Sequence, residues 1–279
     1  PTPFPFSAPL PAEHARAPEK ERRGARLSSH PMRSRASRAS PSLELPPSLS
    51  LRLSSPRSLS SPSLPLSLLL CWLLYAGLAR VFLLDAFGSQ LAGGAPRWRC
   101  AFGIPTQLGA LPALCGLAAR SHAYHTERWV ARCTTSGLSV LETSFVYIFA
   151  AAMLYDFLAF SMRPVLLAHH VISLLSHIYA STCKAARPAF PFYMVGVCLL
   201  EVGSAICSYY WLVAPSRTVL IAFVLTMSLS NLAALVCTAM WWKKTLPGDR
   251  VGAYVAAAVS TLLIVGRQLN AHHVLHVEL

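Results

Sequence analysis

The sequence predicts an all-α fold, a polytopic bundle of about seven transmembrane helices behind a disordered N-terminal tail. Of the 279 residues, 54% are hydrophobic and only 13% are charged, which is too apolar a composition for a soluble domain. The apolar residues gather in runs that are long enough to cross the hydrocarbon core of a bilayer. Most Lys and Arg residues lie in the tail and between these runs, a pattern that sets the topology of membrane proteins.

Four segments are expected along the chain. Residues 1–65 are rich in Arg, Ser and Pro and bury too little apolar surface to offset their ordering entropy, so we predict a disordered basic tail. Because the first methionine is Met32, no function is assigned to the residues before it. Residues 66–96 are expected to form a first anchor and loop, since this apolar run is longer than a signal peptide needs and lacks a clear cleavage site. Residues 97–269 form the main transmembrane domain, and residues 270–279 a short C-terminal tail.

The expected spans follow the apolar runs, at 66–84, 101–119, 138–160, 165–182, 190–213, 218–242 and 251–269. Pro105 and Pro112 predict a kinked or shortened second span, because proline removes a helical hydrogen bond. Seven spans place the tail and the loops 120–136, 183–189 and 243–250 on one side, where they carry 10, 3, 2 and 3 basic residues. The opposite side has five, which predicts a cytosolic N terminus. These five are Arg97, Arg99, Arg163, Arg217 and Arg267.

Several function classes have no support in the sequence. The net charge of +13 does not form a basic stripe with interleaved aromatic residues, so no nucleic-acid partner is expected. The eight cysteines are spread singly without a CxxC pair and are interpreted as small buried hydrophobes. There is no GxSxG, Walker or Rossmann pattern. The His122/His125 pair and the C-terminal histidines do not match the histidine boxes of membrane di-iron enzymes and lie near opposite predicted faces, so no metal and no cofactor are expected.

Ionisable residues within a membrane span are costly unless they face a partner or a cavity, so they are the candidate functional residues. Asp156 ends the third span, and His169 and His170 open the fourth after a short connection, which predicts a tight antiparallel hairpin. The carboxylate would then orient one imidazole, which would move a proton or bind a ligand, and we predict these three as catalytic residues. The alternative is that Asp156 and one histidine only lock the hairpin together.

The fourth span also carries a polar stripe. His170, Ser173 and His177 recur at i, i+3 and i+7 on a helix otherwise made of Val, Ile and Leu, so this face is expected to contact protein rather than lipid. We predict Ser173 and His177 as substrate-binding or lipid-binding residues.

The fifth span places Glu201 near its middle, followed by small residues that permit close helix approach. Glu201 and Ser204 complete the predicted lipid-binding set, although Glu201 has a purely structural alternative as a protonated carboxyl bonded to a neighbouring helix. Glu142, near the cytosolic start of the third span, is interpreted as an interfacial or helix N-terminal residue, where the helix dipole favours an anion.

Three consecutive segments resemble the TLC (TRAM–LAG1–CLN8) domain. They are LETSFVYIFAAAMLYDFLAF, RPVLLAHHVISLLSHIYA and FPFYMVGVCLLEVGSAICSYYWLV, and the likeness covers roughly residues 97 to 269. It rests on the Tyr-Asp pair at 155–156, the His-His pair at 169–170, and Leu200, Glu201 and Ser204. The resemblance implies a multi-helix domain for lipid metabolism and homeostasis, often in the endoplasmic reticulum. The ceramide-synthase pattern continues with a His-Asp segment that CLLEVGSAIC lacks, so the chain resembles the branch outside the ceramide synthases.

These observations lead to a membrane protein that binds or remodels lipids in an intramembrane cavity lined by Asp156, His169, His170, His177 and Glu201. If the protein is an acyltransferase, acyl-CoA is the donor and a histidine is the general base toward a sphingoid or related acceptor. The alternative is a non-catalytic lipid sensor, cargo receptor or assembly factor. Membrane lipids are the expected partners, with homo- or hetero-oligomers left open. The endoplasmic reticulum is the expected location, with the plasma membrane and the Golgi as alternatives, and short loops without receptor motifs argue against a seven-helix receptor.

Overall fold

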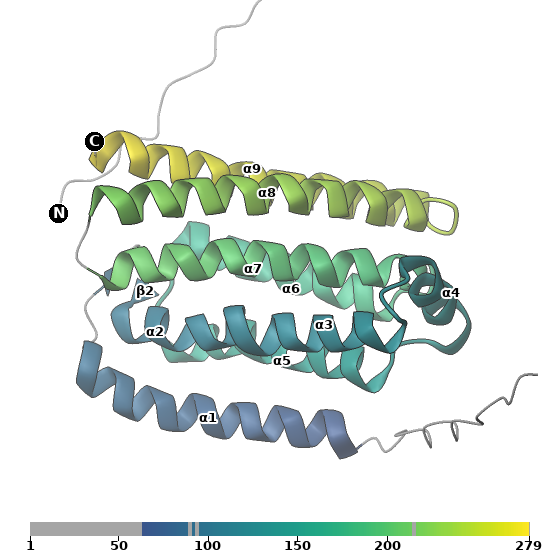
Figure 1. Ribbon diagram of the computed structural model, residues 1–279, viewed down its shortest axis with the longest axis horizontal. Helices are drawn as coiled ribbons and strands as arrows, with labels where there is room; N and C mark the ends of the chain where they lie inside the picture. Colours follow the sequence, from purple (N-terminus) through teal and green to yellow (C-terminus); the bar gives the residue numbers. More distant parts are fainter. Residues whose placement is uncertain (1–62, 89–90, 93–94, 214–215, 279) are drawn as a thin grey trace, which may run out of the picture. The chain divides into compact units, whose positions relative to one another are not determined.

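The computed structural model describes residues 63–88, 91–92, 95–213 and 216–278. Within these residues, seven helical segments are long and apolar enough to cross a membrane, which confirms the predicted all-α polytopic bundle (Figure 1). The chain is thus a multi-pass membrane protein. The predicted disordered tail falls almost entirely outside the described residues.

The helices and strands follow one another with short connections. One span is built from three consecutive elements, α2, η1 and α3, and the short helix α4 lies between spans. In chain order the elements are α1 Ser63–Phe87, β1 Leu91–Ala92, β2 Ala95–Pro96, α2 Arg97–Pro105, η1 Thr106–Ala110, α3 Leu111–Ser121, α4 Thr126–Ser136, α5 Val140–Ala159, α6 Pro164–Thr182, η2 Arg187–Ala189, α7 Phe190–Leu212, α8 Arg217–Thr245 and α9 Arg250–Glu278. Strands β1 and β2 form a small antiparallel hairpin between the first two spans.

The helices pack as an ordered series. α8 lies between α7 and α9 and contacts both, α2 packs on α7, and α1 packs on α2 and α5 (Figure 1). α7 and α8 contact each other along much of their lengths, whereas α6 and α9 meet over only a short stretch. The core between α1, α2, α3, α5 and α7 is built from aromatic and aliphatic side chains such as Trp72, Phe102 and Phe145.

The outward faces of the spans are apolar. Leu158 on α5 and Val165 on α6 are 85% and 84% exposed, and Leu229 on α8 and Leu262 on α9 are also largely exposed. Contiguous exposed apolar surface of this extent is unfavourable in water. In a bilayer these side chains face lipid tails, so the surface pattern agrees with the membrane topology.

The second span differs from its prediction. It runs over Arg97–Ser121 without being shortened, and the proline effect is confined to a π-helical turn, Thr106–Ala110, directly after Pro105. Pro105 has no N–H to donate to the preceding turn, and one additional residue in the turn lets the helical ladder resume. The same turn holds the buried polar residues Thr106 and Gln107, and Trp72 of α1 donates a hydrogen bond from Nε1 to Thr106 Oγ1 at 3.3 Å.

Two predicted segment boundaries also shift. α1 already begins at Ser63, two residues before the predicted end of the tail, because Pro65 is tolerated in the first turn of a helix. The residues predicted as a C-terminal tail continue α9 to Glu278. The stretch NAHHVLHVE contains no Gly or Pro to end the helix, which explains the extension.

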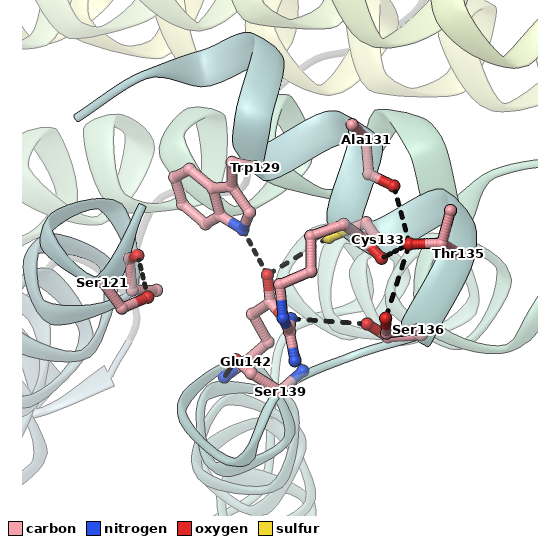
Figure 2. A network of polar contacts seen from close by, with 11 residues as sticks. Ser121, Trp129, Ala131, Cys133, Thr135, Ser136, Ser139 and Glu142 are labelled. Carbon is pink, nitrogen blue, oxygen red and sulfur yellow. Dashed lines mark hydrogen bonds and ion pairs between the residues drawn. The ribbon is translucent and has the colours of Figure 1, made fainter. Parts of the chain in front are cut away.

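Glu142 connects the start of α5 to α4 through hydrogen bonds, as Figure 2 shows. Ser139 is the N-cap of α5, and its side chain and that of Glu142 form a capping box. The carboxylate of Glu142 also accepts hydrogen bonds from Trp129 Nε1, from Arg132 at 3.2 Å and from Cys133 Sγ at 3.2 Å. The helix N-terminal position predicted for Glu142 is confirmed, and its side chain is fully buried under α4.

Burial in this region shifts the pKa values of Cys133 and His122, which lie outside the spans. Burial and the neighbouring Glu142 carboxylate raise the pKa of the Cys133 thiol, so Cys133 is a neutral hydrogen-bond donor and a poor nucleophile. Burial lowers the pKa of His122, whose ring stacks on the Trp129 indole with centroids 5.9 Å apart. The neutral imidazole is therefore favoured at this position.

Replacing Glu142 by Gln is expected to loosen α4. Every group that contacts the carboxylate is a donor, so the Gln amide NH2 faces a donor and Arg132 loses its counter-charge. We expect a loss of about 2–3 kcal/mol of stability, measured by thermal unfolding of the detergent-solubilised protein. Cys133 should also become faster to label with maleimide.

The matched control for this change is Glu127→Gln. Glu127 lies in the first turn of the same helix, is exposed, and makes none of these bonds. Its replacement should leave stability within about 0.5 kcal/mol of the wild type. Equal unfolding temperatures and equal Cys133 labelling for both variants would show that Glu142 does not hold α4.

Candidate functional site

A cavity of about 80 Å³ lies inside the bundle, between α6, α7, α8 and α9, with one residue of α5 at its wall. Its lining mixes polar and apolar side chains, although the helices that form it are overwhelmingly apolar. The polar residues of the lining are His169, Ser173, Ser176, Glu201, Thr238, Ser260 and Arg267. Such a mixture inside a membrane domain is typical of a ligand site.

The cavity has a polar end and an aromatic end. α6 and α8 run in the opposite direction to α7 and α9, so His169, Glu201 and Arg267 lie toward one end of the bundle. Phe192 and Trp241 of the lining lie toward the other end. The helical rise between lining residues, for example from 193 to 201, gives the cavity a length of about 12 Å along the helices. The cavity is thus amphipathic along its length.

His169 and His170 occupy different environments, because neighbouring residues on a helix point about 100° apart. His169 lines the cavity, and neither of its ring nitrogens has a hydrogen-bond partner among the described residues. His170 is turned toward α5 and is buried. The two rings touch at an angle, with centroids 5.8 Å apart.

Asp156 joins His170 to an arginine that the sequence analysis treated as a loop residue. Arg99 of α2 donates to both carboxylate oxygens, from Nε to Oδ1 and from Nη2 to Oδ2 at 2.7 Å. His170 Nε2 lies 2.9 Å from Oδ2, and its Nδ1 lies 3.0 Å from the Leu166 carbonyl oxygen. The predicted contact between Asp156 and a histidine is present, and it is part of an ion-pair cluster that ties α2, α5 and α6 together.

His177 is a structural link in this arrangement rather than part of the cavity lining. Its Nε2 donates to the Val146 carbonyl oxygen of α5 at 3.0 Å, so Nδ1 is left to accept from the Tyr193 hydroxyl of α7, also at 3.0 Å. Tyr193 lines the cavity, and His177 lies behind it, fully buried. The polar residues predicted to form one stripe on α6 therefore face two different directions. Ser173 faces the cavity with His169, whereas His170 and His177 face α5.

Glu201 lines the cavity and is held from the side of the second span. Gln107, in the π-helical turn, donates from Nε2 to Glu201 Oε2 at 2.8 Å. Arg99, Gln107 and Glu201 also line a second, smaller cavity of about 10 Å³. The close helix approach predicted at the small residues after Glu201 is present at Gly203, which is buried. A Cβ at this position would lie 3.2 Å from the Arg267 guanidinium of α9.

Arg267 of α9 is fixed by neutral groups from two other helices. It donates to the Leu200 carbonyl oxygen at 2.7 Å, to Ser204 Oγ at 2.8 Å and to Asn231 Oδ1 at 3.3 Å. Ser204, predicted to bind lipid, thus holds an arginine at the edge of the cavity. Leu200 and Ser204 both contact this arginine, because residues at i and i+4 lie on the same side of α7.

The structure brings three predicted residues to one cavity, namely His169, Ser173 and Glu201. Asp156, His170, His177 and Ser204 are near but do not line it. Sequence reasoning missed Arg99, Gln107 and Arg267. The available signal was that Arg267 lies inside the seventh apolar run, where an arginine needs partners.

The arrangement can hold a polar group and can transfer a proton. His169 presents ring nitrogens that have no hydrogen-bond partner in the described part of the chain, Glu201 presents a carboxyl, and Arg267 presents a fixed guanidinium around one end of the cavity. A free imidazole beside a cavity is suited to general acid–base work, whereas His170 already has an oxygen against each ring nitrogen. Of the two neighbouring histidines, His169 is therefore the one placed to transfer a proton in this cavity.

Replacing Asp156 by Leu is expected to destabilise the bundle strongly, because Arg99 is left as an unpaired charge inside the membrane domain. We expect a loss of about 3–5 kcal/mol, seen as a lower unfolding temperature in detergent and a lower cellular abundance. The double variant Arg99→Met/Asp156→Leu removes both charges and should recover most of this loss. Asp85→Leu, the same change at an exposed residue, is the control. A double variant as unstable as Asp156→Leu would disprove the pairing.

Comparison with models of known protein families gives no match, and neither do comparisons with curated proteins and with solved structures. The likeness to the TLC domain therefore rests on the residues quoted above. The membrane topology and the site geometry do not depend on that likeness, since both follow from the helices and contacts of this chain. The chain is a multi-pass helical membrane protein with an amphipathic cavity among its last five spans.

Proposed function

We propose that this membrane protein binds an amphiphilic lipid in the cavity between α6, α7, α8 and α9. The observation that carries this proposal is the cavity itself, with His169, Glu201 and Arg267 at one end and aromatic rings at the other. A ligand with a polar headgroup and an apolar chain complements both ends. His169 and Ser173 on α6 and Ser260 on α9 keep part of their surface exposed, so a chain can leave the cavity between these two helices.

The resemblance to the TLC domain supports the same function and adds a location. It points to lipid homeostasis in the endoplasmic reticulum, with membrane lipids as partners. Arg97, Arg99 and Arg267 are all committed to contacts between helices, so only Arg163 and Arg217 remain as basic residues in the connections on one side. The loops on the opposite side keep their larger basic share, which favours a cytosolic N terminus.

A catalytic form of this function is acyl transfer from acyl-CoA to an amine or hydroxyl of the bound amphiphile. His169 would take the proton from the attacking group as the thioester carbonyl is attacked. The carbon–sulfur bond breaks, an amide or ester forms, and the proton passes from His169 to the departing CoA thiolate. The cluster of Asp156, His170 and Arg99 would position the start of α6 and would not contact the acyl group.

A non-catalytic lipid sensor or cargo receptor is the second candidate. It is favoured by the hydrogen bonds of Asp156 and His170, because every side-chain oxygen and nitrogen of these two residues already has a partner within the protein. Here the cavity would hold a lipid without changing it. The two candidates differ in the role of the His169 imidazole, which transfers a proton in the catalytic form and only binds the ligand in the other. Replacement by an amide side chain can distinguish these roles.

The test is quantitative lipidomics of cells that lack the protein, rescued by variants at matched protein abundance. We expect His169→Ala to fail to restore the lipid profile, because the cavity loses its free polar group. His125→Ala should rescue fully, since His125 is exposed, lies outside the spans and makes no side-chain cap bond. His170→Ala should mainly lower abundance, because it opens the Asp156 cluster.

His169→Gln separates the two candidates. Gln keeps hydrogen-bonding capacity but cannot act as a base near neutral pH. Failure of this variant would favour catalysis, and rescue would favour binding alone. Full rescue by His169→Ala would refute the proposed role of the cavity.

A further inference from the structure

Arg267 is a fixed cation without a carboxylate against it. The described residues contain three ion pairs, and these join Arg99 to Asp156, Arg132 to Glu142 and His170 to Asp156. Arg267 forms none of them, and all its hydrogen bonds run to neutral oxygens and to the Met227 sulfur. A guanidinium surrounded by apolar helices is strongly unfavourable unless an anion compensates its charge.

The guanidinium is also preorganised. Leu200 and Ser204 of α7 and Asn231 of α8 hold it from two sides. Asn231 is buried and is itself fixed by donating to Gln268 Oε1 at 3.0 Å. The three hydrogen bonds of Arg267 to these residues and the contact with the Met227 sulfur use four of the five N–H groups of the guanidinium, so the side chain does not need to reorganise when a ligand arrives. One N–H on Nη1 remains to donate to a phosphate or carboxylate oxygen.

Arg267 lies at the polar end of the cavity, with Glu201 and His169 in the same lining. No ion pair joins Arg267 to Glu201, whose Oε2 accepts from Gln107. A headgroup at this end would contact the cation on one side. A hydroxyl or amine next to the anionic group would donate to the Glu201 carboxylate on the other side.

We propose that the cavity selects amphiphiles with an anionic headgroup that also carries a hydrogen-bond donor, with Arg267 binding the anionic group and Glu201 the donor. This inference rests on the proposed lipid-binding function and names its ligand class. Glu201 interacts electrostatically with Arg267 but makes no ion pair with it. A neutral amphiphile with the same chain therefore leaves the guanidinium without a direct counter-ion among the described residues, so it binds more weakly. Free phosphate lacks the chain that fills the aromatic end of the cavity.

The test uses the full chain in nonionic detergent and native mass spectrometry to measure bound ligand. The probes are 1-oleoyl lysophosphatidic acid, which has a phosphate and a hydroxyl, and 1-monoolein, which has the same chain and no charge. We expect lysophosphatidic acid to bind about tenfold or more tighter than monoolein. Arg267→Gln should remove this preference and leave monoolein binding unchanged, whereas Arg250→Gln, the same change at an exposed position of α9, should keep it.

The outcomes separate this inference from the function on which it rests. Equal binding of the two probes to the wild-type protein would overturn the headgroup selection and leave lipid binding intact. Loss of both probes to the same extent in Ser260→Phe, which enlarges a half-exposed side chain of the cavity lining, would confirm the site, and no loss there would refute the cavity itself. Displacement of lysophosphatidic acid by an equal concentration of inorganic phosphate would assign Arg267 to a free anion and overturn the lipid assignment. The comparison of probes on the wild-type protein stands even if Arg267→Gln does not fold.

Discussion

The hydrocarbon core of a membrane offers no water, so each polar side chain inside it has to find partners within the protein. Asp156 illustrates this constraint. Its two carboxylate oxygens form hydrogen bonds with Arg99 of α2 and His170 of α6, so the three helices are held together. Apolar side chains pack against lipid tails almost as well as against each other. The polar contacts therefore specify which helices are neighbours, and the apolar surface mainly keeps them in the membrane.

The buried polar groups fall into two sets with different degrees of saturation. In the cluster around Asp156 and in the Glu142 network, each carboxylate forms an ion pair with a basic side chain. Such pairing is expected of polar groups that only stabilise the structure. The lining of the cavity differs, because the nitrogens of His169 have no partner among the residues that the structure describes and Arg267 is held by neutral oxygens. Both proposals rest on this difference, since groups left unsaturated by the protein are those that a ligand can satisfy.

The π-helical turn after Pro105 connects the two sets. It places Gln107 where its amide reaches Glu201 of α7, and Arg99 lies about two turns earlier on the same span. Both side chains line the small cavity with Glu201. A distortion caused by one proline thus joins the ion-pair cluster to the larger cavity, which agrees with the frequent location of π-helical turns at functional sites.

Seven spans, the inward position of Asp156, His170 and Glu201, and the helix N-terminal position of Glu142 could be predicted from the sequence alone. These features depend on local hydropathy, on helix length and on the high cost of charge in hydrocarbon, all of which can be read along one segment. Only the tertiary structure decided that His169 and not His170 lines the cavity, and that Arg99 and Arg267 are buried partners rather than loop residues. One residue along a helix turns a side chain by about 100°, so the neighbour of each group depends on how helices far apart in the chain are rotated against each other.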